Sequence, residues 1–258
     1  MSQARSMKAP GALLLALEGR APWEFGAAIA AFPLLRCMPN GDGHGVVVFP
    51  GLAASDLSTL PLRAFLSASG YRPHGWELRF NLGPRAGVLE RSLDHVRKVR
   101  RATGRKVSLV GWSLGGVYAR EIAKLVPEDV RCVITMGSPF TGHPRANNVW
   151  RVYQLASGHV IDDAEQLHAV RKPPPVPTTS IFSRSDGIVA WPCCVQESGP
   201  LAESIEVTAS HIGMGMNPVT WFVVADRLAQ REGRWKAFHR EGWRRHLFND
   251  PYRACDPG

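Results

Sequence analysis

From residue 45 onward, short apolar runs alternate with longer segments whose apolar residues recur every three or four positions. Val46–Phe49 is a continuous apolar run, typical of a strand that is buried on both faces. Helical spacing of apolar residues predicts helices at 57–69, 87–101, 114–126 and 218–229. Further strands are predicted at 76–80, 107–112, 130–136, 179–182 and 205–207. This alternation predicts an α/β fold with a mostly parallel sheet of about six strands and helices on both faces.

Three segments stand outside this alternation. Residues 1–44 are expected to form a helical lead-in, in which Phe25, Ile29 and Phe32 recur at helical spacing until Pro33 breaks the pattern. Residues 140–177 combine short helical pieces with a proline-rich stretch, which is typical of a small helical lid inserted after the fourth strand. Residues 233–258 form a basic, aromatic extension, part of which reads as a helix. We expect residues 1–258 to form one domain.

The strongest chemical signal is the segment Gly111–Gly116, which reads Gly-Trp-Ser-Leu-Gly-Gly. It follows a predicted buried strand and precedes a predicted helix. A serine whose hydroxyl projects from the end of a sheet needs a sharp, strained strand-to-helix turn. Glycines on either side of it avoid clashes with the neighbouring strand and helix. This context predicts that Ser113 is a nucleophile.

A serine hydroxyl is a weak nucleophile unless a base takes its proton and an acid orients that base. With a turn of this type, the acid follows a late strand and the histidine follows the last one. Asp186 comes just after the strand ending at Phe182, and His211 comes just after the strand around Val207. Asp226 lies beyond the histidine, which is the wrong order. The sequence therefore predicts Ser113, His211 and Asp186 as nucleophile, base and acid.

Negative charge on a tetrahedral intermediate requires N–H donors. One is expected from Leu114, directly after the nucleophile, and the other from Leu52, in the loop after the first buried strand. Gly51 lets this loop turn closely, and Pro50 ends the strand without losing a donor. By its position Ala53 is an equally suitable second donor, and a plain Pro-Gly turn is the alternative interpretation of the loop.

With these motifs the chain resembles the α/β-hydrolase superfamily and, within it, bacterial esterase- and lipase-like members. The resemblance covers about residues 45 to 230. It implies a sheet that lacks the first two strands of the larger superfamily pattern. It also implies hydrolysis of carboxylic esters through an acyl-enzyme, with a lid over an apolar acyl pocket. Many lipases have His-Gly where this chain has Pro50–Gly51, so the donor loop departs from that pattern.

Five residues are candidates for substrate binding because they lie near these motifs or in the lid, although each could instead be a packing residue. They are Trp112, Trp150, Tyr153, Trp191 and Met214. The substrate would be a small-molecule or lipid ester. An acyltransferase or a thioesterase could use the same three residues, and a non-catalytic binding protein of this fold is a further alternative.

Composition and the motifs that are missing mainly exclude other kinds of partner and cofactor. The formal net charge is +9, but no nucleic-acid-binding motif accompanies the basic clusters, so we expect solvated helix faces and no nucleic-acid partner. Absence of HExxH and of GxGxxG after the first strand argues against a metal and a dinucleotide, and no cofactor is expected. The basic extension is expected to dock on the domain, with weak contact to an anionic membrane as the alternative. Without a signal peptide or a membrane-spanning run, a cytoplasmic location is expected.

Overall fold

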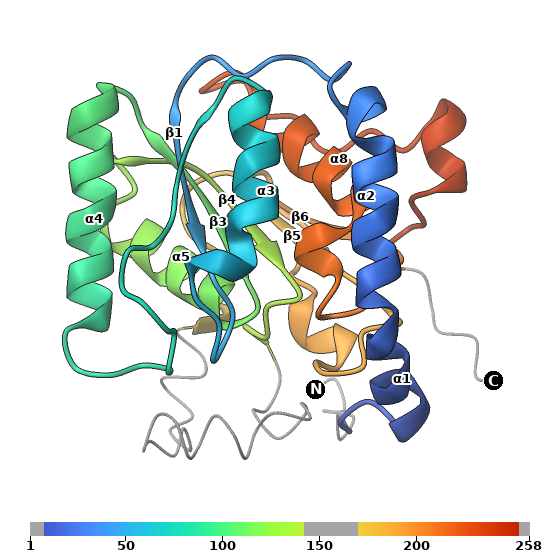
Figure 1. Cartoon of the computed structure of the whole chain (residues 1–258). Coiled ribbons are helices and arrows are strands. Elements are labelled where there is room, and N and C mark those ends of the chain that lie inside the picture. The colour runs from blue at the N-terminus through green and yellow to red at the C-terminus, as the bar shows by residue number, and fades with distance from the viewer. Residues whose placement is uncertain (1–7, 142–169, 253–258) are drawn as a thin grey trace.

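The computed structural model describes residues 8–141 and 170–252. Six strands in this part of the chain form one sheet in the order β2-β1-β3-β4-β5-β6, and every neighbouring pair is parallel (Figure 1). Their bounds are β1 Gly45–Phe49, β2 Arg72–His74, β3 Val107–Trp112, β4 Val130–Met136, β5 Thr178–Phe182 and β6 Ala202–Glu206. The predicted parallel sheet of about six strands is therefore confirmed.

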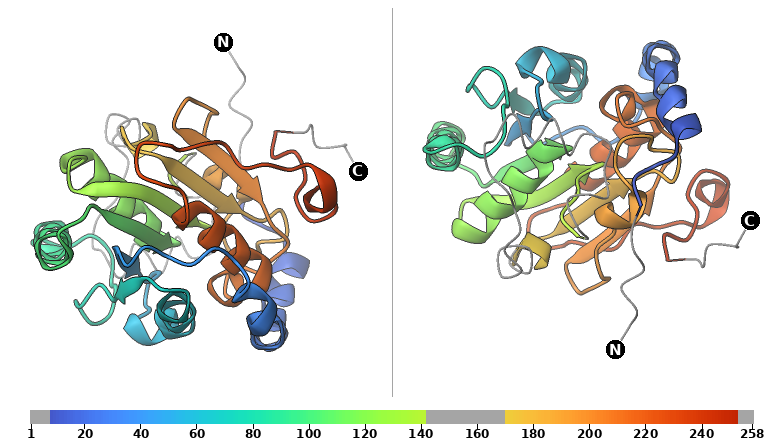
Figure 2. Two further views of the ribbon diagram at one scale, coloured as in Figure 1. Left: turned by 90° about the horizontal axis from the view of Figure 1, so that it is seen from above. Right: turned by 90° about the horizontal axis from the view of Figure 1, so that it is seen from below.

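Helices cover both faces of this sheet, as Figure 2 shows in views from above and from below. One face carries α2 (Ala21–Leu35), α3 (Asp56–Ala68) and α8 (Pro218–Leu228), and the other carries α4 (Val88–Thr103) and α5 (Leu114–Leu125). Shorter pieces are α1 (Ala12–Ala16), η1 (Leu17–Arg20), η3 (Trp191–Cys194), η4 (Met214–Met216) and η5 (Gly242–His246).

The core has two main layers because successive strand residues point to opposite faces. In β1, Val46 and Val48 belong to the cluster under α2, α3 and α8, whereas Val47 and Phe49 belong to the cluster under α4 and α5. Every residue of β1 and β3 is buried. This two-sided burial explains why these two strands are predominantly apolar in the sequence.

The second strand differs from its prediction. The sequence pattern favoured 76–80, but β2 ends at His74 and the chain then enters an irregular loop. The Asp56 carboxylate accepts hydrogen bonds from the amides of Trp76 and Glu77, and both Glu77 and Arg79 have positive φ. These amides are already bonded and the φ values are not those of a strand, so pairing stops before the apolar residues.

The predictions for the segments outside the strand–helix alternation fare differently. The lead-in is helical, but α2 includes Pro33 and ends at Leu35, so the predicted break at the proline was wrong. Residues 142–169, most of the predicted lid and including Trp150 and Tyr153, lie outside the described residues.

The described part of the basic extension, residues 233–252, is irregular except for η5, so the predicted helix was wrong for most of this stretch. It packs on α8: Phe248 stacks on Phe222 at 5.9 Å between ring centroids, and Arg244 pairs with Asp226 at 2.8 Å. The side chains of Phe238 and Phe248 are buried in the same core cluster as α8. Within residues 8–141 and 170–252, no helix has both the length and the apolar character needed to cross a bilayer.

Candidate functional site

Ser113 occupies a strained turn between β3 and α5. Its φ of 54° and ψ of −123° lie in a region that residues with a side chain rarely adopt. Each flanking glycine is required by close backbone packing. A Cβ on Gly111 would lie 2.3 Å from Gly116, and one on Gly115 would lie 2.4 Å from the carbonyl oxygen of Phe49. The strained turn predicted from the sequence is therefore present, and it projects the Ser113 hydroxyl beyond the end of the sheet.

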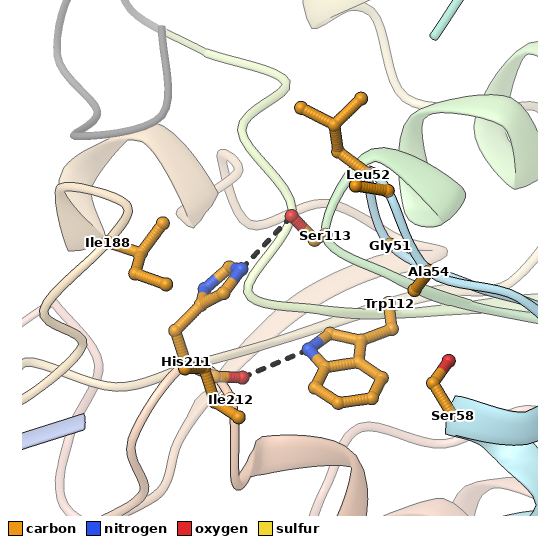
Figure 3. A pocket seen from close by; sticks show the side chains of 10 residues that line it. Gly51, Leu52, Ala54, Ser58, Trp112, Ser113, Ile188, His211 and Ile212 are labelled. Atoms are coloured by element: carbon orange, nitrogen blue, oxygen red, sulfur yellow. Dashed lines mark hydrogen bonds between the residues drawn. The ribbon is translucent and has the colours of Figure 1, made fainter. Parts of the chain in front are cut away.

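His211 and Asp186 reach Ser113 from the loops that follow β6 and β5. The imidazole Nε2 of His211 lies 3.0 Å from Ser113 Oγ, and its Nδ1 lies 2.7 Å from Asp186 Oδ2 (Figure 3 shows the first contact). The other carboxylate oxygen of Asp186 accepts hydrogen bonds from the amides of Ile188 at 2.8 Å and Val189 at 2.7 Å. The carboxylate is thus held from both sides, and it orients the imidazole toward the serine.

The surroundings of His211 favour its protonated form. Burial alone would lower the pKa of this imidazole, but the Asp186 carboxylate, by its charge and its hydrogen bond, and the nearby Glu18 carboxylate outweigh burial. The net effect is a pKa raised above the ordinary value for histidine. Such a group is well suited to take a proton from a neighbouring hydroxyl and to hold it briefly.

The loop after β1 lies beside Ser113, as expected for a donor loop. The ideal Cβ position of Gly51 is 3.3 Å from Ser113 Cβ, so the two turns are in contact. The amide of Ala53 donates to the carbonyl of Asn81 at 2.7 Å, and Ala53 has a φ of 57°. Because the Ala53 amide is already used, Leu52 is the better candidate of the two for a second N–H donor beside that of Leu114.

A cavity of about 320 Å³ opens beside Ser113 and His211. Its lining, among the described residues, is mostly apolar (Figure 3) and consists of Gly51, Leu52, Ala53, Ala54, Ser58, Trp112, Ser113, Ile188, His211 and Ile212. Sequence reasoning missed Ile188 and Ile212, although each is within two residues of Asp186 or His211. Proximity to the two motifs was the signal that could have found them.

The described residues among the predicted substrate-binding side chains have different surroundings in the structure. Trp112 lines the cavity, and its indole N–H donates to the carbonyl of His211 at 3.0 Å. Met214 is instead fully buried in the core beneath α2, α3 and α8. Trp191 packs on Phe182 and lies under the guanidinium of Arg184, in a separate small cluster. Neither residue lines the cavity in the part of the chain that the structure describes. Met214 is turned into the core, whereas Trp191 is half-buried, and a role in substrate binding stays a prediction for both.

Gly137, at the end of β4, is a site residue that the sequence analysis did not single out. Its φ is +58°, and a Cβ there would lie 3.1 Å from His211 Nδ1 and 3.3 Å from Asp186 Oδ2. The glycine thus leaves room for the contact between the imidazole and the carboxylate.

A second set of serine, histidine and aspartate side chains lies near the start of β3. His44 Nε2 is 2.8 Å from Ser108 Oγ, and its Nδ1 is 2.5 Å from Asp42 Oδ1. His44 and Ser108 are fully buried, and neither lines the cavity beside Ser113. Among the described residues, no group of histidine, cysteine, aspartate and glutamate side chains is arranged to hold a metal ion.

Comparisons with known proteins bear on the fold. No protein-family model and no curated protein matches the sequence. Among solved structures, lipase B of Aspergillus fumigatus is similar with a TM-score of 0.57 at 17% identity, over 75% of this chain and 54% of that one. This chain therefore spans about half the length of that lipase.

Two further structures are similar over most of their own length. The monoacylglycerol lipase of Paleococcus ferrophilus matches with a TM-score of 0.52 at 14% identity, covering 74% of this chain and 96% of that one. An α/β superfamily hydrolase of Oenococcus oeni matches with a TM-score of 0.52 at 15% identity, covering 74% and 94%. Together with the parallel six-stranded sheet, these similarities show that the chain has the α/β-hydrolase fold.

Proposed function

We propose that this protein hydrolyses carboxylic esters through a covalent acyl-enzyme on Ser113. The observation that carries the proposal is the continuous chain of contacts from Asp186 Oδ2 to His211 Nδ1, at 2.7 Å, and from His211 Nε2 to Ser113 Oγ, at 3.0 Å. A hydroxyl, an imidazole and a carboxylate in this order are the parts that acyl transfer to serine needs. The adjoining cavity gives a substrate access to them.

In the first half of the reaction, Ser113 Oγ attacks the ester carbonyl carbon while His211 Nε2 takes the hydroxyl proton. Asp186 stabilises the resulting imidazolium and keeps its ring oriented. The oxygen of the tetrahedral intermediate carries a negative charge, for which the amides of Leu52 and Leu114 are the proposed donors. The bond from carbon to the alcohol oxygen then breaks, and His211 gives its proton to the departing alcohol.

In the second half, a water molecule attacks the acyl-enzyme and gives a proton to His211 Nε2. A second tetrahedral intermediate collapses, the bond between the acyl carbon and Ser113 Oγ breaks, and the proton returns to the serine. The products are a carboxylic acid and an alcohol, and the protein regains its starting state. If another nucleophile replaces water at this stage, the same residues perform acyl transfer.

The apolar lining of the cavity favours an uncharged, apolar acyl group. Trp112, Ile188 and Ile212 supply the larger apolar surfaces, and the volume of about 320 Å³ lies at the small end of ligand sites. Esters of short and medium acyl chains are therefore the expected substrates.

Hydrolysis of p-nitrophenyl esters with acyl chains of two to sixteen carbons tests the proposal. Wild-type protein should hydrolyse the shorter esters, and the rate should fall as the chain outgrows the cavity. Ser113→Ala should abolish turnover without loss of folding, measured by circular dichroism. A fluorophosphonate probe should label wild-type protein at Ser113 and leave the variant unlabelled.

The remaining outcomes distinguish the alternatives. Labelling without ester turnover would favour acyl transfer or a thioester substrate, and product analysis with competing alcohols and with acyl thioesters separates those two. A folded wild-type protein that neither turns over an ester nor reacts with the probe would overturn the proposal.

A further inference from the structure

The N-terminal segment before α2 buries a carboxylate where a hydrophobic side chain would be expected. Among residues 8–20, all of which the structure describes, Glu18 is the only buried residue. Its neighbours Leu13, Leu15 and Leu17 are exposed. A segment that exposes three of its four leucines and buries a carboxylate does not owe its position to the hydrophobic effect alone. An ionised side chain is buried only when hydrogen bonds compensate for the water it loses.

Glu18 receives this compensation from the two loops that carry the acid and the base. Its Oε1 accepts hydrogen bonds from the amide of Gly187 at 2.7 Å and from the amide of His211 at 2.9 Å, and its Oε2 accepts one from Ile212 at 2.8 Å. Gly187 directly follows Asp186. One carboxylate therefore connects the backbone beside the acid to the backbone of the histidine itself.

Two glycines in these loops leave room for the N-terminal segment. A Cβ on Gly187 would lie 2.2 Å from the carbonyl oxygen of Leu14, and one on Gly213 would lie 2.3 Å from Glu24 Oε2. The first contact shows that the α1 backbone lies directly against the loop that carries Asp186. The second shows that the start of α2 lies against the loop that carries His211. Figures 1 and 2 show α2 running beside α8, which follows that loop in the chain.

Arg20 and Glu24 reinforce the same connection. Arg20 donates to the carbonyl and hydroxyl oxygens of Ser185 at 3.0 and 2.8 Å, and it also donates to Glu24 at 3.0 Å. Glu24 in turn accepts from the amide of Ser210 at 2.7 Å. The loop that carries Asp186 is thus held by Arg20, and the loop that carries His211 is held by Glu24 at the start of α2.

We propose that Glu18 is a positioning residue, which sets the distance and orientation of His211 relative to Asp186 and Ser113. This inference rests on the proposed function, because it assigns to Glu18 an effect on the chemistry of that same site. Glu18 touches no reacting atom. It acts through the backbone of the histidine, and a misplacement of about 1 Å at a catalytic group can cost about 100-fold in rate.

The charge of Glu18 also acts on the imidazole. Charged side chains described on the segments packed around His211 include Glu18, Arg20, Glu24, Arg184, Asp186 and Glu206. Of these, Asp186 and Glu18 raise the pKa of His211, and Arg184 is paired with Glu206. Removing the Glu18 charge while keeping the size of its side chain should therefore lower that pKa.

Glu18→Gln is the variant that tests the proposal, and Glu203→Gln is its matched control. Both wild-type carboxylates are 5% exposed and accept several hydrogen bonds, including at least one from a backbone amide. Glu203 bonds to Thr179, Arg227 and the amide of Phe238, away from the site. Any general cost of neutralising a buried carboxylate should appear in both variants.

With the fastest ester substrate, Glu18→Gln should lower kcat about 10- to 100-fold and change KM less than about threefold. The acid limb of its pH–rate profile should also move to lower pH. Glu203→Gln should keep the kcat and the pH profile of the wild type. An unchanged kcat in folded Glu18→Gln, or an equal loss in both variants, would overturn the inference while the proposed hydrolysis still stands.

The imidazole pKa of His211, followed by NMR, gives a readout that does not depend on turnover. Measured in wild type, Glu18→Gln and Glu203→Gln, it should fall only in Glu18→Gln. Should this pKa stay the same in all three proteins, the inference fails whatever the ester assay shows. Absence of ester turnover and of probe labelling in wild type would instead count against the proposed function.

Discussion

Two arrangements of serine, histidine and aspartate lie at opposite ends of β3. At its carboxyl end, Ser113 contacts His211 at 3.0 Å, and at its amino end Ser108 contacts His44 at 2.8 Å. The second imidazole nitrogen of each histidine contacts a carboxylate, at 2.7 Å in the first set and 2.5 Å in the second. By residue type and distance alone, the two sets are equivalent.

Access and backbone geometry separate them. Ser113 lies on a turn with positive φ at the edge of a cavity, next to the first amides of α5 and the loop after β1. Ser108 lies within a strand and is fully buried, and its hydroxyl is also contacted by the thiol of Cys132 at 3.3 Å. Of the two serines, only Ser113 borders a cavity, whereas the second set is a hydrogen-bonded cluster in which His44 and Ser108 are buried and Asp42 is partly exposed.

Electrostatics separates them further. Burial lowers the pKa of His44, and the nearby Arg131 and Arg105 lower it too, so that the hydrogen bond and charge of Asp42 do not restore its ordinary value. Around His211, burial is outweighed by Asp186 and Glu18, and the pKa rises. The comparison teaches that a base for catalysis needs a neighbourhood that tolerates its protonated form, which contact distances do not reveal.

Replacing the two serines should produce the largest contrast. Ser113→Ala should lower kcat for the best ester about 10⁶-fold, because the nucleophile is lost. Ser108→Ala should keep kcat within about twofold, since no substrate reaches it. Steady-state hydrolysis of the two purified variants measures both. Comparable losses in the two variants would refute the assignment of roles.

Replacing the two aspartates should give the second-largest difference in kcat. Asp186→Asn should lower kcat about 10⁴-fold, because an amide no longer stabilises the imidazolium or the required tautomer. Asp42→Asn should leave kcat near the wild-type value. The same assay applies, with urea unfolding as a check that both variants are folded. Full activity in Asp186→Asn would mean that another acid orients His211.

Gly137 tests how closely the first set must be assembled. A methyl group in Gly137→Ala would meet His211 Nδ1 at 3.1 Å in a backbone conformation with positive φ. Displacement of the ring by part of an ångström should lower kcat about 100-fold. A matched control is Gly87→Ala, which also has positive φ but has no atom within 4 Å of the added Cβ. Equal activity in both glycine variants would show that the imidazole tolerates displacement.

Replacing the two histidines should affect the free energy of unfolding in the reverse order, with the larger loss at His44. His44→Ala removes the partner of the buried Ser108 hydroxyl and should lower the free energy of unfolding by about 1–3 kcal/mol. His211→Ala should lower it less, because water in the cavity can replace the imidazole. Urea unfolding of both variants at pH 7.5 measures the difference. A larger loss in His211→Ala would contradict the view that the second set belongs to the core.

The pH dependence of stability should give the smallest effect, with opposite signs for the two histidines. The pKa of His44 is lowered on folding, so its contribution is complete above the unfolded value of about 6.5 and is lost as pH falls below it. The pKa of His211 is raised, so its contribution is complete below about 6.5 and is lost as pH rises through the folded pKa.

Urea unfolding from pH 5 to 8 tests these signs. Relative to wild type, His44→Gln should reduce the loss of stability below pH 6.5, and His211→Gln should reduce the loss above it. Slopes that change in the same direction in both variants would show that one of the two shifts has the wrong sign.

Much of the site follows from local pattern and chain order. The sequence Gly-Trp-Ser-Leu-Gly-Gly after a buried strand predicts the strained turn, because that turn leaves no room for side chains at the glycine positions. Asp186 and His211 follow from their places after late strands, and the structure brings both within hydrogen-bonding distance of their expected partners. Their catalytic roles are the proposal made above.

Other features required contacts between residues that are far apart in the sequence. Nothing local marks Glu18, whose partners are Gly187, His211 and Ile212, more than 160 positions away. Similarly, the end of β2 depends on the Asp56 carboxylate, which takes the amides of Trp76 and Glu77. A hydrophobicity pattern cannot register such hydrogen bonds, so it placed this strand too late.

By itself the sequence determined the α/β alternation, the parallel sheet, the strained serine turn and the order of serine, acid and histidine. These depend on side-chain periodicity, on glycine positions and on the direction in which parallel strands end. Only the tertiary structure decided which serine faces a cavity, which tryptophan lines it and which buried carboxylate joins the two loops. Burial, hydrogen-bond partners and electrostatic surroundings arise when distant segments pack together, and no single segment of the sequence contains them.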